Sequence, residues 1–391
     1  MVNSKMRFLI VDDMSNMRRT IRNMLRHLGY ISFEEADQGI PALDKLKHHK
    51  IDFVICDWNM PEMTGIELLR LTRKDRKLKD IPFLMVTAEI AEETVAEAAE
   101  TEVDGYIIKP FVARTLQEKI EKIMEIRTNP TEFDSLLGEA QSSAESGSLD
   151  KALAEYQKAL ELKPNSARVL EGIGKLYEQL GKTAEAEQKY LEAININPQY
   201  VKGYQTLSEF FEKNGKRDRA RESLERAVKI SPRNPDRQTE LGHLYLKEGK
   251  SELARQAFSK AVDVDPRNVE RRMQIGESFL EAGMPEEAGM AFQEALKLRP
   301  EDIHIYNRLG IAFRKQGRFQ DAISEYFKAL TVDPEDEVLH YNLGRAYLEA
   351  GEKHKASAEF RKALQLKPKF KEASDILRTM EAEEKAGVTV S

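Results

Sequence analysis

Cysteine and tryptophan are almost absent from this chain of 391 residues, since each occurs once. The single cysteine, Cys56, cannot form an internal disulfide, so the sequence lacks a disulfide framework and suits a reducing compartment. The N-terminal apolar run Phe8–Val11 is too short for a signal peptide. No stretch reaches the roughly 18 apolar residues of a membrane span. We therefore expect a cytoplasmic protein without membrane insertion.

An excess of positive charge is also lacking. The net charge is −6 and the isoelectric point is near 5.9, so the chain has no general attraction for nucleic acid or anionic membrane. Hydrophobic residues make up 41% of the chain, which indicates folded domains rather than disorder. The length exceeds what one hydrophobic core usually holds, so we expect two or more domains.

Before residue 130, short apolar runs alternate with amphipathic stretches. The expected strands are Phe8–Val11, Ile51–Cys56, Phe83–Val86 and Tyr106–Ile108, with a weaker one around Tyr30–Phe33. The expected helices are Met17–His27, Pro41–His48, Ile66–Arg73, Glu92–Glu100 and Leu116–Ile126. Alternation of this kind predicts an α/β fold, a doubly wound parallel sheet of five strands with helices on both faces.

After residue 130 the sequence is almost entirely helix-forming and repeats every 34 residues. Prolines recur at this spacing from 164 to 368 and glycines from 147 to 351. Two alanine positions recur with the same period, from 152 to 356 and from 159 to 363. Four residue positions that share one period identify a repeat array.

The period has a structural interpretation in which each unit is a pair of helices joined by a tight turn. Glycine ends the first helix because it tolerates left-handed backbone geometry, and proline stops the second because it cannot continue a helix. Alanines lie where the paired helices approach closely. One unit cannot bury its own apolar face, so neighbouring units stack into an all-α solenoid.

These patterns predict the domain boundaries. The first domain covers residues 1–127 and a short linker covers 128–132. Seven repeats cover 133–370, and a capping helix with a tail covers 371–391. The individual repeats are 133–166, 167–200, 201–234, 235–268, 269–302, 303–336 and 337–370. The chain from Ile126 to Phe133 spans at most about 25 Å, so we expect the first domain to lie near the first repeat.

The repeats resemble the tetratricopeptide (TPR) family over about residues 133–370. In the repeat that begins at Ile303, the family pattern is met by Tyr306, Leu309, Gly310, Phe313, Ala322, Tyr326, Ala329 and Pro334. The repeat from Glu337 meets it with Leu343, Gly344, Tyr347, Ala356, Phe360, Ala363 and Pro368. The first repeat departs from the pattern at Glu139, Ala140 and Ser143, as is expected of an end repeat.

The resemblance implies that the repeats bind a protein or peptide in a groove lined by their first helices. Groove positions of the family, carried over to repeats five to seven, combine apolar anchors with charges. The candidate partner-binding residues are Met273, Leu280, His304, Asn307, Ile311, Arg314, Tyr341, Arg345 and Leu348. The alternative is that the apolar members of this set pack between neighbouring helices.

In the first domain, polar residues follow the predicted strands. Asp12 and Asp13 follow the first strand, Asp57 ends the third, Thr87 the fourth and Lys109 the fifth. In a doubly wound sheet these strand ends lie on one edge, so the five residues converge in one cleft.

Clustered carboxylates repel one another, and Mg²⁺ relieves the repulsion with oxygen ligands. Asp57 is then a nucleophile for a phosphoryl group, and Lys109 offers a point charge to the phosphoryl oxygens. Singly, each residue has an ordinary structural role such as a helix cap or a solvated lysine. The complete set indicates a site.

The first 127 residues resemble the CheY-type chemotaxis response regulator. The matching stretches are 8–13 (FLIVDD), 57–61 (DWNMP), 85–89 (MVTAE) and 109–111 (KPF). The resemblance implies a flavodoxin-like receiver domain in which Asp57 accepts a phosphoryl group from a histidine kinase or a small phosphodonor. It also implies that Asp12, Asp13, Asp57 and the backbone carbonyl of Asn59 surround Mg²⁺.

In the family, the threonine at the position of Thr87 moves to hydrogen-bond the phosphoryl group, and the tyrosine at the position of Tyr106 rotates inward as a switch. The Lys109–Pro110 bond is expected to be cis. From the residues alone, Tyr106 is equally an ordinary half-buried aromatic.

We therefore predict a two-component response regulator that signals through protein–protein interactions of its TPR array. Nothing indicates a DNA-binding or separate enzymatic output domain, so no enzyme activity is expected beyond self-catalysed phosphorylation of Asp57 and its hydrolysis. The alternative is a CheY-like chemotaxis or motor regulator, or a phosphate sink, in which the repeats only localise the receiver. A third interpretation is a constitutive scaffold with a vestigial receiver.

Overall fold

The computed structural model describes residues 5–61, 63–88 and 103–388, with side chains up to residue 382. It divides into two compact units, Met1–Arg237 and Gln238–Ser391, which are described in turn. Across the described residues, no helix combines the length and the apolar character that a membrane crossing requires.

The first unit begins with a parallel sheet of five strands in the order β2-β1-β3-β4-β5. The strands are β1 (Arg7–Val11), β2 (Ser32–Ala36), β3 (Phe53–Asp57), β4 (Phe83–Thr87) and β5 (Gly105–Ile108). The doubly wound order predicted from the alternating pattern is confirmed. Every residue of β3 and β4 is buried, as expected for central strands covered on both faces.

The second strand lies later in the chain than its expected position around Tyr30–Phe33. It begins at Ser32, because Gly29 first turns the chain with a φ of 89°. Tyr30 is buried, and its ring packs edge-on against Phe8 at 4.6 Å between ring centroids. The aromatic character of Tyr30 therefore serves the core rather than the strand.

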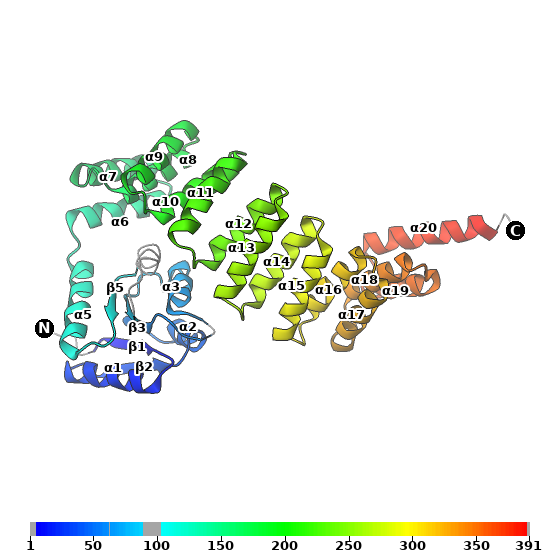
Figure 1. Cartoon of the computed structure of the whole chain (residues 1–391), viewed down its shortest axis with the longest axis horizontal. Coiled ribbons are helices and arrows are strands. Elements are labelled where there is room, and N and C mark those ends of the chain that lie inside the picture. The colour runs from blue at the N-terminus through cyan, green and yellow to red at the C-terminus, as the bar shows by residue number, and fades with distance from the viewer. Residues whose placement is uncertain (1–4, 62, 89–102, 389–391) are drawn as a thin grey trace. The chain divides into compact units, whose positions relative to one another are not determined.

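Four helices cover the sheet in the described residues, namely α1 (Ser15–His27), α2 (Gly39–His48), α3 (Gly65–Lys74) and α5 (Ala113–Thr128). Apolar side chains of α1 and α5 pack on one face of the sheet, and those of α2 and α3 pack on the other (Figure 1). The helix expected at Glu92–Glu100 lies outside the described residues.

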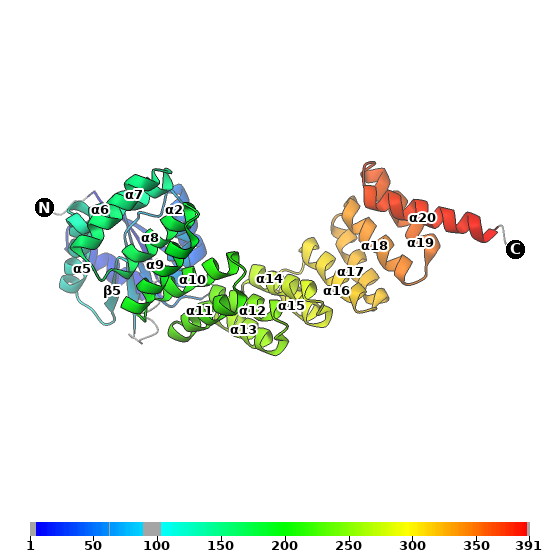
Figure 2. The same ribbon diagram turned by 90° about the horizontal axis from the view of Figure 1, so that it is seen from above.

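After the sheet, the chain consists of helix pairs, which make up the rest of the first unit and the second unit (Figures 1 and 2). In the first unit they are α6 (Glu132–Glu145), α7 (Leu149–Leu162), α8 (Ala167–Gln179), α9 (Thr183–Ile196), α10 (Val201–Lys213) and α11 (Arg217–Ile230). Helix α12 (Pro235–Lys247) begins in the first unit. The second unit continues with α13 (Ser251–Val264), α14 (Val269–Glu281), α15 (Pro285–Leu298), α16 (Ile303–Lys315), α17 (Phe319–Val332), α18 (Glu337–Glu349), α19 (Lys353–Leu366) and α20 (Lys371–Val388).

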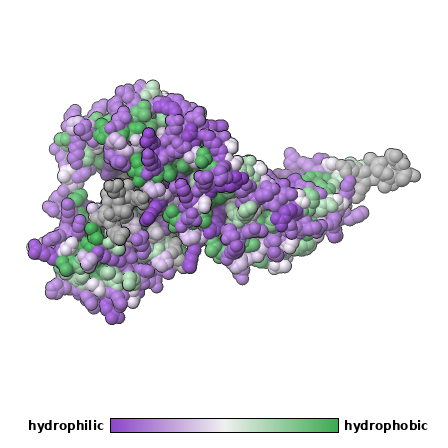
Figure 3. Space-filling model, in the orientation of Figure 1, coloured by the Kyte–Doolittle hydropathy of each residue, from purple (hydrophilic) through white to green (hydrophobic). Residues whose placement is uncertain are grey.

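The periodic small residues have the roles that their spacing predicts. The glycines from Gly147 to Gly351 follow the first helices of the pairs with φ between 71° and 82°. The alanines of both periodic sets are fully buried at 0% exposure, from Ala152 to Ala363. Hydrophilic side chains cover most of the visible outer face (Figure 3).

A glycine inside the first helix of most pairs allows a close approach that the turn glycines do not explain. A Cβ added at Gly310 would lie 2.6 Å from the ring of Tyr326, which is fully buried on the second helix of the same pair. A methyl group does not fit at that distance. The helix pair therefore closes only because this position carries a hydrogen atom.

We predict that Gly310→Ala destabilises the protein by about 1–3 kcal/mol, because the added methyl group overpacks the contact with Tyr326. Gly138→Ala is the matched control, since a methyl group added at Gly138 of α6 would meet no described atom within 4 Å outside its own helix turn. The control should gain up to about 1 kcal/mol from helix propensity. Thermal unfolding followed by circular dichroism distinguishes the two variants, and equal shifts would contradict the packing argument.

Candidate functional site

Three carboxylates meet at the carboxyl edge of the sheet. Asp12 follows β1 and is fully buried, Asp57 ends β3 with 8% exposure, and Asp13 is exposed. One oxygen from each lies within 4.8 Å of the others. The sheet topology thus brings together residues that lie up to 45 positions apart in the sequence.

Lys109 connects two of these carboxylates. Its Nζ donates to Asp12 Oδ2 and to Asp57 Oδ1, each at 3.0 Å. Burial by itself lowers the pKa of Lys109, but the hydrogen bonds with Asp57 and Asp12 outweigh it and raise the pKa. The ammonium group therefore stays charged and compensates part of the carboxylate repulsion. The Lys109–Pro110 peptide bond is cis, as the resemblance implied.

The backbone around Asp57 orients its carboxylate. The N–H of Trp58 donates to Asp57 Oδ1 at 3.0 Å, and the Cys56 thiol donates to the Asp57 carbonyl oxygen at 3.2 Å. Burial raises the pKa of Asp57, and Lys109 opposes the rise through its hydrogen bond and its charge. Burial also raises the pKa of Cys56 well above its ordinary value, so the thiol remains protonated.

The start of α3 supports Asp57 in a way that the sequence analysis missed. The Gly65 N–H donates to the Trp58 carbonyl at 3.0 Å, and a Cβ at Gly65 would lie 2.2 Å from the Asp57 carbonyl oxygen. Thr64 and Glu67 close a capping box around this helix start. The Thr-Gly pair followed by Glu67 was a recognisable signal, because Thr-x-x-Glu is the sequence pattern of a capping box.

The other predicted residues of this domain lie near the same edge. Thr87 ends β4 and is buried at 4% exposure, whereas Asn59 is exposed two residues after Asp57. Tyr106 lies on β5 with 37% exposure, and Lys119 Nζ lies 5.3 Å from its ring centroid. The structure therefore holds Tyr106 facing outward. Glu89, which belongs to a motif of the resemblance, lies outside the described residues.

The donor set fits Mg²⁺. Hard oxygen ligands of this kind surround Mg²⁺ at about 2.1 Å, so oxygens on one ion lie at most about 4.2 Å apart. The three carboxylate oxygens lie within 4.8 Å of one another, which is slightly more than this maximum. A side-chain rotation or a bridging water makes up the difference. Asp12, Asp13 and Asp57 would hold the ion, with the Asn59 carbonyl as the further ligand that the resemblance implies.

The predicted groove residues belong to the second unit, and their surroundings differ. Leu280 is buried at 7% exposure and packs inside the array, so its proposed role as an anchor is corrected. Arg345 donates to Glu349 at 3.1 Å, and Arg314 pairs with the same carboxylate. Asn307 accepts from Asn342 at 2.8 Å.

The remaining groove candidates are only partly buried or exposed. Tyr341 packs against Phe370 at 4.9 Å between ring centroids. Met273, Ile311 and Leu348 are half-buried, and His304 is exposed. These side chains therefore remain available to a partner, which leaves the groove prediction open for all members except Leu280.

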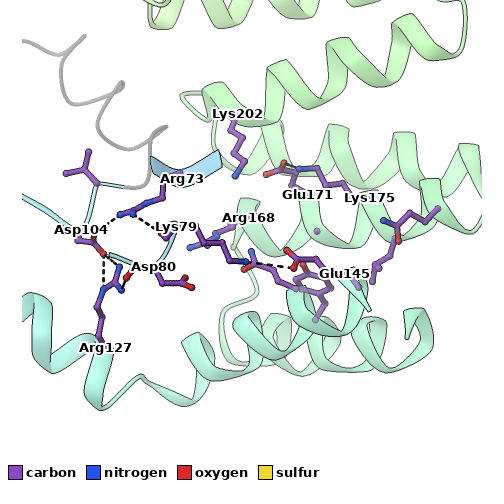
Figure 4. Close-up of a pocket in the computed structure, with 17 residues that line it drawn as sticks. Arg73, Lys79, Asp80, Asp104, Arg127, Glu145, Arg168, Glu171, Lys175 and Lys202 are labelled. Atoms are coloured by element: carbon purple, nitrogen blue, oxygen red, sulfur yellow. Dashed lines mark hydrogen bonds and ion pairs between the residues drawn. The ribbon is translucent and has the colours of Figure 1, made fainter. Parts of the chain in front are cut away.

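A charged cleft of about 780 Å³ lies in the first unit, between the amino edge of the sheet and the first repeats (Figure 4). On the sheet side, Asp104 accepts from Arg73 and Arg127, each at 2.8 Å. Lys79 Nζ lies 3.9 Å from Glu145 of α6. The cleft is at the end of the sheet opposite to Asp57.

On the repeat side of this cleft, a buried carboxylate joins two neighbouring repeats. Glu171 of α8 is 3% exposed, and it accepts from Thr206 of α10 at 2.9 Å and from Lys175 at 2.5 Å. Burial tends to raise the pKa of Glu171, but Lys175 and the other cations and donors around it lower it below its ordinary value. Glu171 therefore stays ionised and joins neighbouring repeats.

Comparison with known families assigns both parts of the chain. Residues 8–121 match the response regulator receiver domain, residues 141–181 match the TPR repeat, and residues 167–200 match the tetratricopeptide repeat. Residues 201–388 match the C-terminal domain of cilia and flagella-associated protein 70. The two expected resemblances, to receiver domains and to TPR repeats, are confirmed.

Similar proteins cover the first domain almost completely. Chemotaxis protein CheY-3 of Vibrio cholerae is 53% identical over 124 residues, which are 32% of this chain and 95% of that protein. Chemotaxis protein CheY of Pseudomonas aeruginosa is 55% identical over 120 residues, 31% of this chain and 97% of that protein. Among solved structures, the crystal structure of a tetratricopeptide repeat protein from Parabacteroides merdae aligns with 64% of this chain and 99% of its own chain. The sequence identity is 18% and the TM-score is 0.41.

We predict that Asp13→Asn weakens Mg²⁺ binding at least about tenfold, because one charged oxygen ligand is lost. Trp58 is the single tryptophan and neighbours Asp57, so its fluorescence reports a Mg²⁺ titration. Asp44→Asn is the control, since Asp44 is exposed on α2 and pairs with His48 at 3.1 Å. A full Mg²⁺ response in Asp13→Asn would exclude the carboxylate cluster as the metal site.

Proposed function

We propose, from the premise that this chain belongs to the response regulator family through its CheY-like receiver domain, that Asp57 accepts a phosphoryl group and that the tetratricopeptide repeats carry the output by binding proteins. The observation that supports this most strongly is the geometry of Lys109, whose ammonium group bridges Asp57 and Asp12 at 3.0 Å each. The proposed phosphodonor is a histidine kinase.

The transfer follows from the orientation of Asp57. Its free carboxylate oxygen attacks the phosphorus of a phosphohistidine, the P–N bond breaks, and the departing imidazole keeps the electron pair. Lys109 remains charged and neutralises oxygens of the phosphoryl group, while the Trp58 N–H holds Oδ1 in place at 3.0 Å. Hydrolysis of the resulting acyl phosphate returns Asp57 to its carboxylate form.

Mg²⁺, when held by Asp12, Asp13 and Asp57, supplies positive charge that offsets the approach of an anionic phosphoryl group to three carboxylates. Thr87 is buried at the end of β4, where its hydroxyl is the proposed hydrogen-bond donor to the phosphoryl oxygens. Tyr106, half exposed on the neighbouring strand β5, is the proposed switch that turns inward afterwards.

The charged cleft is the place where we propose that a conformational change of the receiver affects the repeats. The Lys79–Glu145 ion pair is exposed at 43% and 73% of the two side chains, so it contributes at most about 1 kcal/mol. A contact this weak is easily shifted when the receiver changes conformation. We propose that phosphorylation of Asp57 alters the contact between the receiver and the first repeats.

A small-angle scattering measurement tests this coupling. We expect Mg²⁺ with beryllofluoride, a phosphoryl mimic, to change the scattering profile of the full chain, whereas Asp57→Ala should show the same profile with and without the mimic. Unchanged profiles in the wild-type chain would contradict a phosphorylation-controlled contact between receiver and repeats.

The output is proposed to be protein binding without a further enzymatic activity, in a cytoplasmic protein. Partner segments are expected to engage the groove of repeats five to seven through the half-buried residues Met273, Ile311 and Leu348. Arg314 and Arg345 share Glu349, so each retains donors for an acidic group of a partner.

Affinity capture from the source cell extract tests the output. We expect the chain with Mg²⁺ and beryllofluoride to retain a partner that Asp57→Ala does not retain, because only the first has the phosphorylated conformation. The double variant Arg314→Ala, Arg345→Ala should lose partners held by the groove. Identical partners in all samples would mean that binding is independent of both the receiver and these arginines.

A second candidate function is favoured by the curated relatives, which are chemotaxis proteins made of little more than a receiver domain. In this alternative the receiver acts through its own surface, as a chemotaxis or motor regulator or as a phosphate sink, and the repeats only localise it. Removal of residues 133–391 distinguishes the two functions, since only the alternative predicts that signalling is retained.

A further inference from the structure

A second hollow in the repeats has features of a ligand site, and it is lined by different residues from the groove, although both use α14. It has a volume of about 400 Å³ and lies between α13, α14 and α15 in the second unit. Its wall is apolar, with Phe258, Ile275 and Phe279 buried and Val262 half-buried. Met290 lines the opening with 62% of its surface exposed.

Arg272 of α14 lines this hollow in an unusual state. Its Nε and Nη1 atoms are buried, and they have no hydrogen-bond partner among the residues that the structure describes. Two carboxylates also line the hollow, but both are engaged elsewhere. Glu287 accepts from Arg255 at 2.6 Å, and Glu294 pairs with Lys297 at 2.5 Å. Two buried guanidinium nitrogens without a hydrogen-bond partner are costly, and a carboxylate supplied from outside removes that cost.

The position of Arg272 in repeat seven shows which partner repeat five lacks. His340 stands 68 residues after Arg272, which is two repeat lengths, and it contacts Glu359 at 2.6 Å. Glu359 in turn stands 68 residues after Ala291, which lines the hollow beside Arg272. Repeat seven therefore contains both partners of a hydrogen-bonded contact, whereas repeat five contains an arginine and an alanine.

A corresponding hollow in the first unit confirms that the position is a repeated structural feature. It lies between α9, α10 and α11, and nine of the eleven residues that line it stand 68 positions before residues of the hollow around Arg272. Tyr204 occupies the position of Arg272, and Glu222 that of Met290. The combination of an unpartnered arginine with an exposed apolar side chain therefore distinguishes repeat five from repeat three.

We propose that the hollow between α13, α14 and α15 binds a segment of a partner protein that presents a bulky apolar side chain next to an aspartate or glutamate. The apolar side chain would contact Phe258, Phe279 and Met290, whose thioether adapts to irregular shapes. The carboxylate would accept from the Arg272 guanidinium, for which a bidentate pair is the favoured geometry. This site shares α14 with the predicted groove but none of its residues.

Selection of short peptides from a displayed library on the immobilised full chain supplies the probe. We expect the selected peptides to combine a Leu, Phe or Trp with a neighbouring Asp or Glu. Synthetic versions should lose affinity about tenfold or more for Arg272→Met and for Met290→Glu. Arg308→Met is the matched control, because it removes the same charge from α16, where Arg308 pairs with Glu277 at 2.7 Å. The control should bind as the wild type does.

A stability measurement keeps the test independent of the selected peptide. Arg272→Met removes two buried nitrogen atoms that have no hydrogen-bond partner among the described residues, so thermal unfolding should stay unchanged or shift upward. A clear downward shift would mean that Arg272 has an ion pair within the chain, which overturns the proposal. Selection of no peptide, or equal binding to wild type and Arg272→Met, also overturns it. Binding of dodecanoate without any selected peptide would replace the protein partner by a fatty acid and refute the proposal as stated.

Discussion

Close approach between the backbone and its packing partner is the constraint on which both parts of this protein depend. In the receiver, α3 begins so near to Asp57 that a methyl group at Gly65 would lie 2.2 Å from the Asp57 carbonyl oxygen. In the repeats, a methyl group at Gly310 would lie 2.6 Å from the ring of Tyr326. A hydrogen atom is the one substituent that fits at either position. The first contact places Asp57, and the second closes the helix pairs of the repeats.

Charges are arranged differently in the two parts. The receiver gathers three carboxylates and shares one ammonium group between two of them, an arrangement that favours a cation and a phosphoryl group. The repeats mostly compensate their charges internally, as the burial and pairing of Glu171 illustrate. Where compensation is incomplete, as at Arg272, the array has the means to recognise an anionic group of another protein.

Repeats of one length therefore need not present the same surface. Positions separated by 68 residues carry Tyr204, Arg272 and His340. His340 contacts Glu359, whereas Nε and Nη1 of Arg272 have no hydrogen-bond partner among the described residues. The shared alanines and glycines keep the helix pairs alike, while the residues that line corresponding hollows differ between repeats. The array combines a uniform framework with individually different surfaces.

The sequence by itself determined the fold of each part and the composition of the acidic site, because strand order and period are encoded in local patterns. Strand ends of a doubly wound sheet converge by topology, so Asp12, Asp57 and Lys109 were predictable as a group. Only the tertiary structure decided that Lys109 bridges both carboxylates, that Leu280 is buried and that Arg272 has no partner in the described chain. Such contacts depend on how side chains from separate helices and strands meet, and periodicity alone contains no record of that.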